Sequence, residues 1–526
     1  MESSSDQIKS TLKHALIYSA ASIFGKAVGF LMLPVYAHYI KAEGYGIMSM
    51  IDVVISVLGL LIGYGIASAM RLFYFRIESE RNRMVFVSTN ITLMIILVTI
   101  ITFPALLFAD FIASLAFGKD GLTYYLILGM LAFMAETTAR NAENYILIQQ
   151  RSLLYTAISI ARLFIGLFLN IYFIVFLEMG VSGFLYSSLM TAAFFSVIIH
   201  TYVYYYVGFH FCKEDAKNIL KFSLPLVPGY VAMFFRINAD RIILRKYLGL
   251  APLGAYEMLL KFVSILVVII TDPLMKSWDV KRMEVCDTKT GPEFMARMFT
   301  YHMALSFFLG LILAVEIPLV LRILTPQEFW LGGEIAAFAV LSRVLMDSYY
   351  HFFFGLVYAK ETFKISVIQF ISAGLDVVFN LVLIRYLGIL GAVLASSAVS
   401  AVQCSIAYFM ARPKYFIPFE WRKLVLMSFT LVALFFAVSG ISSENNALFS
   451  WLINNTQEQV RSILETVNLD QLKNGSIMMY VLNNLSLIYE SVIKLLAACS
   501  FMLILPFLGI FPGRMSPAPQ VAPIER

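Results

Sequence analysis

The chain has 526 residues, of which 60% are hydrophobic and only 14% are charged, and its mean hydropathy is +0.82. Soluble globular proteins carry roughly 25% charged residues, so this composition excludes a soluble protein. The formal net charge of +6 does not indicate nucleic-acid binding, because the basic residues lie in short loops between apolar stretches, where membrane orientation explains them better.

Apolar stretches of about 20 residues, the length that crosses the hydrocarbon layer as a helix, recur from Ala15 almost to Phe511. The first stretch is longer than the apolar region of a secretory signal, about 7–15 residues, so it is predicted to be an uncleaved span. The sequence predicts an all-α polytopic membrane protein of about fourteen transmembrane helices. In chain order they cover residues 15–40, 45–69, 85–109, 122–147, 152–177, 182–206, 222–247, 255–278, 294–322, 333–358, 365–386, 390–411, 424–441 and 485–511.

Basic residues alternate between the loops in the way that the positive-inside rule requires. If the amino terminus is inside, the inner segments hold most of the 39 Lys and Arg residues. The pattern therefore predicts an even number of spans with both termini in the cytoplasm.

The carboxyl-terminal part departs from the pattern of short loops. Residues 413–511 are predicted to form an extra helix pair with an outer polar insertion, 442–484. Within the insertion Val460, Ile463, Leu464 and Val467 recur at helical spacing, which fits either a short amphipathic helix on the outer surface or a mobile loop. The Pro-rich tail, 512–526, is predicted to be disordered.

The chain also contains an internal repeat. Tyr39-Ile40 leading to Gly46 and Tyr247-Leu248 leading to Gly254 lie 208 residues apart, as do Gly180 and Gly388. Asn170 and Asn380 agree at an offset of 210. The repeat predicts an amino-terminal six-helix lobe, 1–212, and a second one, 213–412, related by a pseudo-two-fold axis along the membrane normal. Chance matches and close helix packing are the alternative explanations.

Residues along the first span and the second half resemble a known family. They are Ser19, Phe24, Lys26, Gly29-Phe30, Pro34, Tyr36 and Gly44-Tyr45-Gly46, then Pro225, Asp240-Arg241, Gly249, Gly254 and Tyr256, and finally Asn380 with Gly388-Ile-Leu-Gly391-Ala392. This pattern, over roughly residues 10–412, resembles bacterial polysaccharide transporters of the Wzx type. Their superfamily, the multidrug/oligosaccharidyl-lipid/polysaccharide exporters, also contains MATE-like multidrug extruders and lipid II flippases.

The resemblance implies a flippase for undecaprenyl-diphosphate-linked oligosaccharides in the bacterial inner membrane, with two lobes around a central cavity. Such a flippase would serve the biosynthesis of surface polysaccharides such as lipopolysaccharide or exopolysaccharide. Its partners would be membrane lipids, the lipid-linked oligosaccharide, a polysaccharide polymerase and glycosyltransferases. The extra pair and the insertion depart from the usual twelve spans, and two alternatives stay open: a cation-coupled multidrug or metabolite extruder, and a lipid II flippase.

Charged residues inside predicted spans are costly unless they face protein or a watery cavity. A diphosphate that leaves water needs cations, and Arg offers a bidentate fork to phosphate oxygens. Lys26 and Arg162 lie near mid-span without an acid four residues away, so they are the first candidates for binding the diphosphate. The further candidates are Arg140, Arg236, Arg241 and Arg343.

Several of these cations have a carboxylate at the i,i+4 spacing that brings side chains together on a helix. The predicted pairs are Glu136–Arg140, Arg236–Asp240, Glu257–Lys261, Arg343–Asp347 and Glu490–Lys494. Such pairs can also neutralise each other with no role in transport. Among the acids without a basic neighbour, Asp52 and Asp376 are the candidates for binding a coupling proton or sodium ion.

Other classes of site have no support in the sequence. The cysteines, Cys212, Cys286, Cys404 and Cys499, and the six histidines are scattered, so no metal site, cofactor or disulfide framework is predicted. No GxxxxGK[ST] phosphate loop occurs. The insertion has no His and few carboxylates, so we do not expect an enzyme.

Overall fold

The structure is a computed structural model. It describes residues 25–26, 28–62 and 65–439 and, near the carboxyl end, residues 491, 492, 494–496, 498, 499, 501 and 506. The predicted amphipathic helix at 442–484, most of the span at 485–511 and the tail at 512–526 lie outside the described residues.

All the regular elements of the described residues are helices. They are α2 (Leu33–Ile62), α3 (Gly65–Tyr74), α4 (Glu80–Leu107), α5 (Ala109–Phe117), α6 (Thr123–Ile148), α7 (Ser152–Asn170), α8 (Gly180–Val207), α9 (Lys213–Ser223), α10 (Val227–Leu248), α11 (Leu250–Leu266), α12 (Asp272–Val285), α13 (Gly291–Leu324), α14 (Trp330–Glu334), α15 (Ala336–Phe352), α16 (Phe354–Tyr358), α17 (Thr362–Ala411) and α18 (Trp421–Ser439). A π-helical stretch, Ile171–Phe176, continues α7, and another, Val267–Thr271, joins α11 to α12.

The predicted spans from 45–69 to 424–441 coincide with these helices. In the described residues eight helices are long and apolar enough to cross a membrane, or nine if one bent pair is counted as a single span. The chain is therefore an all-helical, multi-pass membrane protein, and the full count of fourteen stays a prediction. Two predicted boundaries fall inside long helices, where single residues break the helical geometry: Lys41 in α2 and Gly388 in α17.

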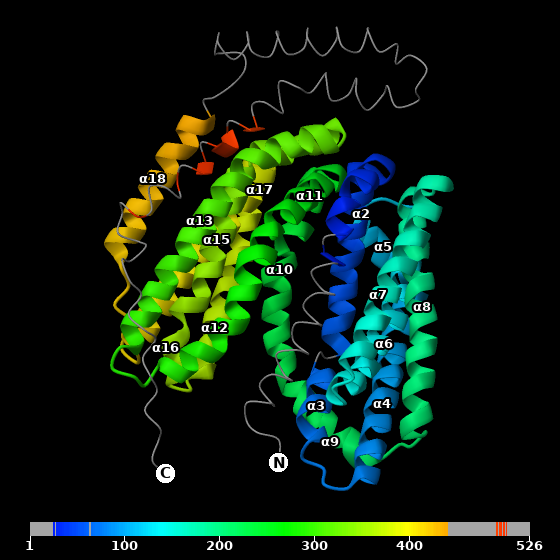
Figure 1. The fold of residues 1–526 in the computed structure, drawn as a ribbon. Coiled ribbons are helices and arrows are strands. Elements are labelled where there is room, and N and C mark those ends of the chain that lie inside the picture. The colour runs from blue at the N-terminus through cyan, green and yellow to red at the C-terminus, as the bar shows by residue number, and fades with distance from the viewer. Residues whose placement is uncertain are drawn as a thin grey trace, which may run out of the picture. The chain divides into compact units, whose positions relative to one another are not determined.

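The fold divides into two compact units (Figure 1). Unit 1 comprises residues 1–257 and 369–389, and unit 2 comprises 258–368 and 390–526. The division falls within α11 and α17, whereas the lobes predicted from the sequence divide the chain at 212/213. The lobe boundaries stay a prediction.

In unit 1 the amino-terminal helices pack lengthwise around α6. Figure 1 shows α4, α6 and α8 side by side, and α6 contacts both of the others. Small residues of α6, Ala139 and Ala142, are fully buried against Val87 and Ile91 of α4 and Ile199 of α8. Small side chains let helices approach closely in a membrane, and this core fixes the helix that carries the charged residues described below.

Unit 2 is built on the pairing of α13 with α15, which lie side by side in Figure 1. Aromatic rings fill its interior near the segment that precedes α18. Phe299 of α13 lies edge-on to Phe352 of α15, with ring centroids 5.2 Å apart, and to Phe419, at 5.1 Å. Aromatic pairs at such distances add stabilisation beyond their buried area.

The backbone of unit 1 supports the internal repeat. Lys41 and Gly249, 208 residues apart, both have positive φ, 61° and 91°. Gly180 and Gly388, at the same offset, also have positive φ, 55° and 60°. Positive φ is uncommon outside glycine, so its recurrence at equivalent positions indicates that both halves turn the chain in the same way.

Two glycines at equivalent positions of the repeat, Gly46 and Gly254, each lie close to a backbone carbonyl of the other half. A Cβ added to Gly46 would lie 2.0 Å from the carbonyl oxygen of Leu250, and one added to Gly254 would lie 1.8 Å from that of Ala42. Ala42 and Leu250 are themselves 208 residues apart, so each half presents the same glycine to the same carbonyl of the other. Such reciprocity is typical of a two-fold contact.

Candidate functional site

A charged network links α6 and α7 in unit 1. Glu136, Arg140 and Glu143 recur at i, i+4 and i+7, which places them along one face of α6. Arg140 Nε lies 2.6 Å from Glu136 Oε1. Arg162 of α7 bonds to Glu143 through Nη2, and its Nη1 lies 3.8 Å from the same Glu136 oxygen. Glu136 therefore bridges two arginines, and the network balances two carboxylates with two guanidinium groups.

Burial differs sharply between the two arginines. The Arg162 side chain is 15% exposed and that of Arg140 is 61% exposed. Arg162 also stacks over the Phe195 ring, 5.2 Å from its centroid, an arrangement that favours a cation. Arg162 is thus held in place from three sides, while the Arg140 guanidinium is accessible to an anion.

A second network joins α10, α11 and α2. Arg241 bonds to Glu257 through Nε, and its Nη2 lies 3.4 Å from Glu257 Oε2. The Ser49 hydroxyl donates to Glu257 Oε1 at 2.8 Å. Ser49 and Glu257 are also 208 residues apart, so equivalent positions of the two halves meet directly. Asp240 accepts a hydrogen bond from Tyr256 at 2.6 Å and another from the Arg241 backbone amide at 2.8 Å.

Arg236 of α10 pairs with Asp376 of α17, with Nη1 and Oδ1 3.5 Å apart. Both side chains are buried, at 9% and 2% exposed. Asn380, one helical turn after Asp376, donates its side-chain amide to the Asp376 carbonyl at 2.8 Å. The carboxylate predicted to bind a coupling ion is therefore the partner of a buried arginine.

The charged pair of α15 lies in unit 2. Arg343 Nη2 is 2.9 Å from Asp347 Oδ1, and the Thr271 hydroxyl donates to Asp347 Oδ2 at 2.6 Å. The Asp347 side chain is 1% exposed and that of Arg343 is 28% exposed. This pair belongs to unit 2, whereas the three networks above belong to unit 1.

The two remaining candidates lie on exposed positions of the amino-terminal helices. Lys26 and Asp52 are both exposed. Asp52 is on α2, where its backbone carbonyl accepts a hydrogen bond from Ser56. The predicted roles of Lys26 and Asp52 stay predictions.

Helical spacing predicted part of this arrangement. Glu136–Arg140 and Arg343–Asp347 form as expected. The predicted pair Arg236–Asp240 was an incomplete description. The described hydrogen bonds of Asp240 come from Tyr256 and from the Arg241 backbone amide, and Arg236 contacts Asp376, which lies 140 residues later in the chain. Glu490, the predicted partner of Lys494, lies outside the described residues.

Several functional-site residues were missed or underrated by sequence reasoning. Glu143 and Glu257 hold Arg162 and Arg241, neither of which has an acid at i,i+4. A buried polar chain on α4 and α6 was also missed: Asn141 donates to Asn90, which donates to the Ile66 carbonyl. The sequence does show polar residues within apolar spans at these positions. Such residues are expected to face the protein interior, but the sequence does not indicate which partner they contact.

The networks share a chemistry. Each guanidinium is held by a carboxylate, and all but the exposed Arg140 are mostly buried, where charge-assisted hydrogen bonds are strong and an unpaired charge is costly. A phosphate oxygen has the geometry to replace a carboxylate oxygen at the same nitrogen atoms. Within the described residues no three His, Cys, Asp or Glu side chains converge as a metal site.

Comparison with known proteins identifies the family. A family model described as polysaccharide biosynthesis protein matches residues 11–278, just over half of the chain. The chain belongs to this family. No curated protein matches the sequence.

Solved structures with the same fold are transporters of the MOP superfamily. A lipid II flippase, MurJ, in an inward closed conformation matches with a TM-score of 0.68 and 13% identity over 94% of this chain and 99% of that chain. An inward-facing multidrug resistance MATE family transporter matches with a TM-score of 0.55 and 15% identity over 76% and 94%. A MOP superfamily transporter from Pyrococcus furiosus gives 0.53 and 14% over 76% and 95%. At these identities the likeness shows the fold alone.

The family predicted from the sequence is thereby confirmed. The chain has the fold of a MOP superfamily transporter and belongs to a polysaccharide biosynthesis family, rather than to a class of enzymes. It is a multi-pass membrane protein.

Proposed function

We propose that this protein is a secondary transporter that flips undecaprenyl-diphosphate-linked oligosaccharides across the bacterial inner membrane for surface polysaccharide biosynthesis. The observation that carries the proposal is the family match over residues 11–278, because that family is described by polysaccharide biosynthesis. Both termini would lie in the cytoplasm. Glycosyltransferases would supply the substrate, and a polymerase would consume it.

The α6–α7 network supports recognition of a diphosphate. Arg140 is exposed and has a single described carboxylate partner, so it is the residue that first meets the anion. When a phosphate oxygen replaces Glu136 at Arg140, Glu136 keeps its contact with Arg162. Exchange of one anion for another at a guanidinium leaves no cation unpaired, which avoids the cost of a lone buried charge.

The other predicted cations take supporting roles in this proposal. Arg236, Arg241 and Arg343 are mostly buried and paired, so they hold helices in register and set the local charge. Lys26, on an exposed position of the first span, attracts the headgroup electrostatically. Asp52 and Asp376 remain candidates for the coupling ion.

The test is the variant R140A, at the exposed arginine of the network, in a strain that depends on this chain for surface polysaccharide. We expect loss of surface polymer with accumulation of lipid-linked precursor on the inner leaflet, measured by carbohydrate blots and lipid extraction. K289A, in the loop between α12 and α13, is the matched control and keeps wild-type polymer. Normal polymer from a stably produced R140A variant would reject the site assignment.

A lipid II flippase is the second candidate. The observation that favours it is the share of this chain that matches each structure, which is 94% for MurJ and 76% for the MATE transporter. Under this alternative, depletion of the protein stops wall growth and lipid II accumulates, while surface polysaccharide falls only as growth stops. Altered resistance to cationic dyes with normal polysaccharide would instead point to the extruder.

A further inference from the structure

Two histidines form a buried pair in unit 2 that the proposed substrate site does not use. His302 of α13 and His351 of α15 face each other with Nδ1 and Nε2 3.0 Å apart. They are 1% and 5% exposed. Two imidazoles at this distance share one hydrogen along the N···N line.

The proton inventory of the pair allows it to bind one further proton. Two neutral imidazoles carry two N–H groups on four ring nitrogens, so one nitrogen stays free to accept. Adding a proton to that free nitrogen gives one imidazolium. Both outward nitrogens then carry a hydrogen, and the two inward nitrogens share the third. A second added proton would place two positive charges about 3 Å apart, which is strongly disfavoured. The capacity of the pair is therefore one proton.

Protonation changes what the pair requires of its surroundings. Once the pair is charged, the outward nitrogens, including His302 Nε2, are both donors. In the described part of the chain His302 Nε2 has no hydrogen-bond partner. An unsatisfied buried donor on a cation is costly, so uptake of a proton favours a rearranged contact between α13 and α15 over the one observed.

The surroundings can accept a cation. The Phe299 ring lies 5.0 Å from the His351 ring and that of Trp278 lies 6.4 Å away, and aromatic faces attract cations. Arg282 opposes a positive charge on the pair, but its guanidinium is itself paired with Asp279 at 2.8 Å. Two further carboxylates lie on the adjoining elements, Asp347 one turn before His351, held by Arg343, and Glu420, bonded to Thr300 and Lys423.

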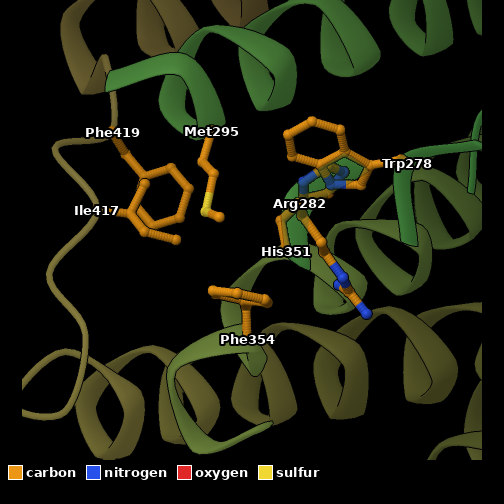
Figure 2. A pocket seen from close by; sticks show the side chains of 7 residues that line it. All are labelled: Trp278, Arg282, Met295, His351, Phe354, Ile417 and Phe419. Atoms are coloured by element: carbon orange, nitrogen blue, oxygen red, sulfur yellow. The ribbon is translucent and has the colours of Figure 1, made fainter. Parts of the chain in front are cut away.

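A route for the proton leads to His351. A small cavity with room for about one water molecule is lined by His351, Trp278, Arg282, Met295, Phe354, Ile417 and Phe419. Figure 2 shows these side chains around the opening. The cavity lies beside the segments 279–290 and 412–420, both predicted to be cytoplasmic, so a water molecule there can pass a proton to the ring.

We propose that the His302–His351 pair is a proton-binding site that holds the coupling ion during transport. The proposal rests on the proposed secondary transport, because it names the ion that drives it. One proton would enter or leave the pair per transport cycle, and its charge would bias the packing of α13 on α15. Neither histidine belongs to the networks that are proposed to contact the diphosphate.

Trp278 provides a direct readout of the proton, because its ring lies against His351 and an imidazolium ion quenches indole fluorescence. The chain has four tryptophans, so the variant W330F/W421F/W451F reports Trp278 alone. We expect its fluorescence to fall in a single-proton titration as the pH is lowered. In this background H302Q and H351Q should each abolish the titration. The control H200Q, at a histidine of α8 that does not belong to the pair, should leave the titration unchanged.

A transport measurement tests the coupling. In proteoliposomes an imposed pH gradient should accelerate flipping of lipid-linked oligosaccharide by the wild type at least tenfold more than by H302Q or H351Q. Both variants should keep a slow flipping rate that does not depend on the gradient. Persistence of the Trp278 titration in both variants, or undiminished acceleration in them, would overturn the proposal. If no form flips the oligosaccharide, the proposed function fails instead, while the fluorescence titration still decides whether the pair binds a proton. Thermal unfolding at neutral pH verifies that each variant is folded.

Discussion

The two units stabilise polar side chains inside an apolar fold in different ways. Unit 1 holds arginine–carboxylate networks, in which each carboxylate contacts guanidinium groups from the same or another helix. In the described residues of unit 2, two arginines of this kind pair with aspartates on their own helix, Arg343 with Asp347 and Arg282 with Asp279. Unit 2 also packs aromatic rings against two imidazoles that contact each other. Fixed charges recognise an anion, whereas imidazoles change charge at accessible pH. This difference is the basis of our two proposals, recognition of the diphosphate by the α6–α7 network of unit 1 and proton binding by the histidine pair of unit 2.

The largest expected effect breaks the network of unit 1. R162A leaves the buried Glu143 without its guanidinium, and removing one partner of a buried ion pair costs about 3–5 kcal/mol. We expect a large fall in the thermal unfolding temperature of the detergent-purified protein. The double variant R162A/E143Q removes both charges and should recover much of the loss. Equal stability of R162A and wild type would show that the network does not contribute to folding.

The reciprocal glycine contact gives the next largest effect. G254A places a Cβ 1.8 Å from the Ala42 carbonyl oxygen, so α2 and the start of α11 must separate, at a cost of about 3 kcal/mol. The control G374A, also in unit 1, meets no atom within 4 Å and should be neutral or slightly stabilising. Both are compared by thermal unfolding, and similar results for the two would refute the close approach.

A smaller effect of opposite sign is expected at Lys41. Its backbone has φ 61° and ψ 173°, a region that is essentially restricted to glycine, and the equivalent residue of the repeat is Gly249. K41G should stabilise the protein by about 1 kcal/mol, because relief of strain exceeds the added freedom of the unfolded chain. K41A keeps a Cβ and should give no such gain, which separates backbone strain from the loss of the lysine charge.

The smallest effect concerns an exposed pair of lysines in unit 2. Hydrogen bonds from Lys364, and then from Lys414, lower the pKa of the Glu361 carboxyl from its ordinary value of 4.5. The pKa is lower in the folded state, so this stabilisation is present above pH 4.5 and is lost as the pH falls through the folded value. E361Q should flatten the acid limb of a plot of unfolding temperature against pH and leave unit 1 unaffected. An identical acid limb would show that the contacts are too exposed to matter.

Sequence reasoning reached the helices and the family because both depend on local pattern. An apolar stretch of about 20 residues forms a membrane helix whatever its neighbours are, and eight described helices, or nine with one bent pair, are long and apolar enough to cross a membrane. The repeat stays a prediction, which the positive φ of Gly180 and Gly388 and the close approaches of Gly46 and Gly254 support.

The partners of the charged residues could be read only where they lie on one helix. Spacing found Glu136–Arg140, because i and i+4 meet on any α-helix. It could not find Arg162 with Glu143, Arg241 with Glu257 or Arg236 with Asp376, nor bring together two of the scattered histidines. The sequence thus determined which residues had to be buried in a membrane fold, and the packing of one helix on another decided which of them met, because contacts between helices depend on rotation and register that no local pattern encodes.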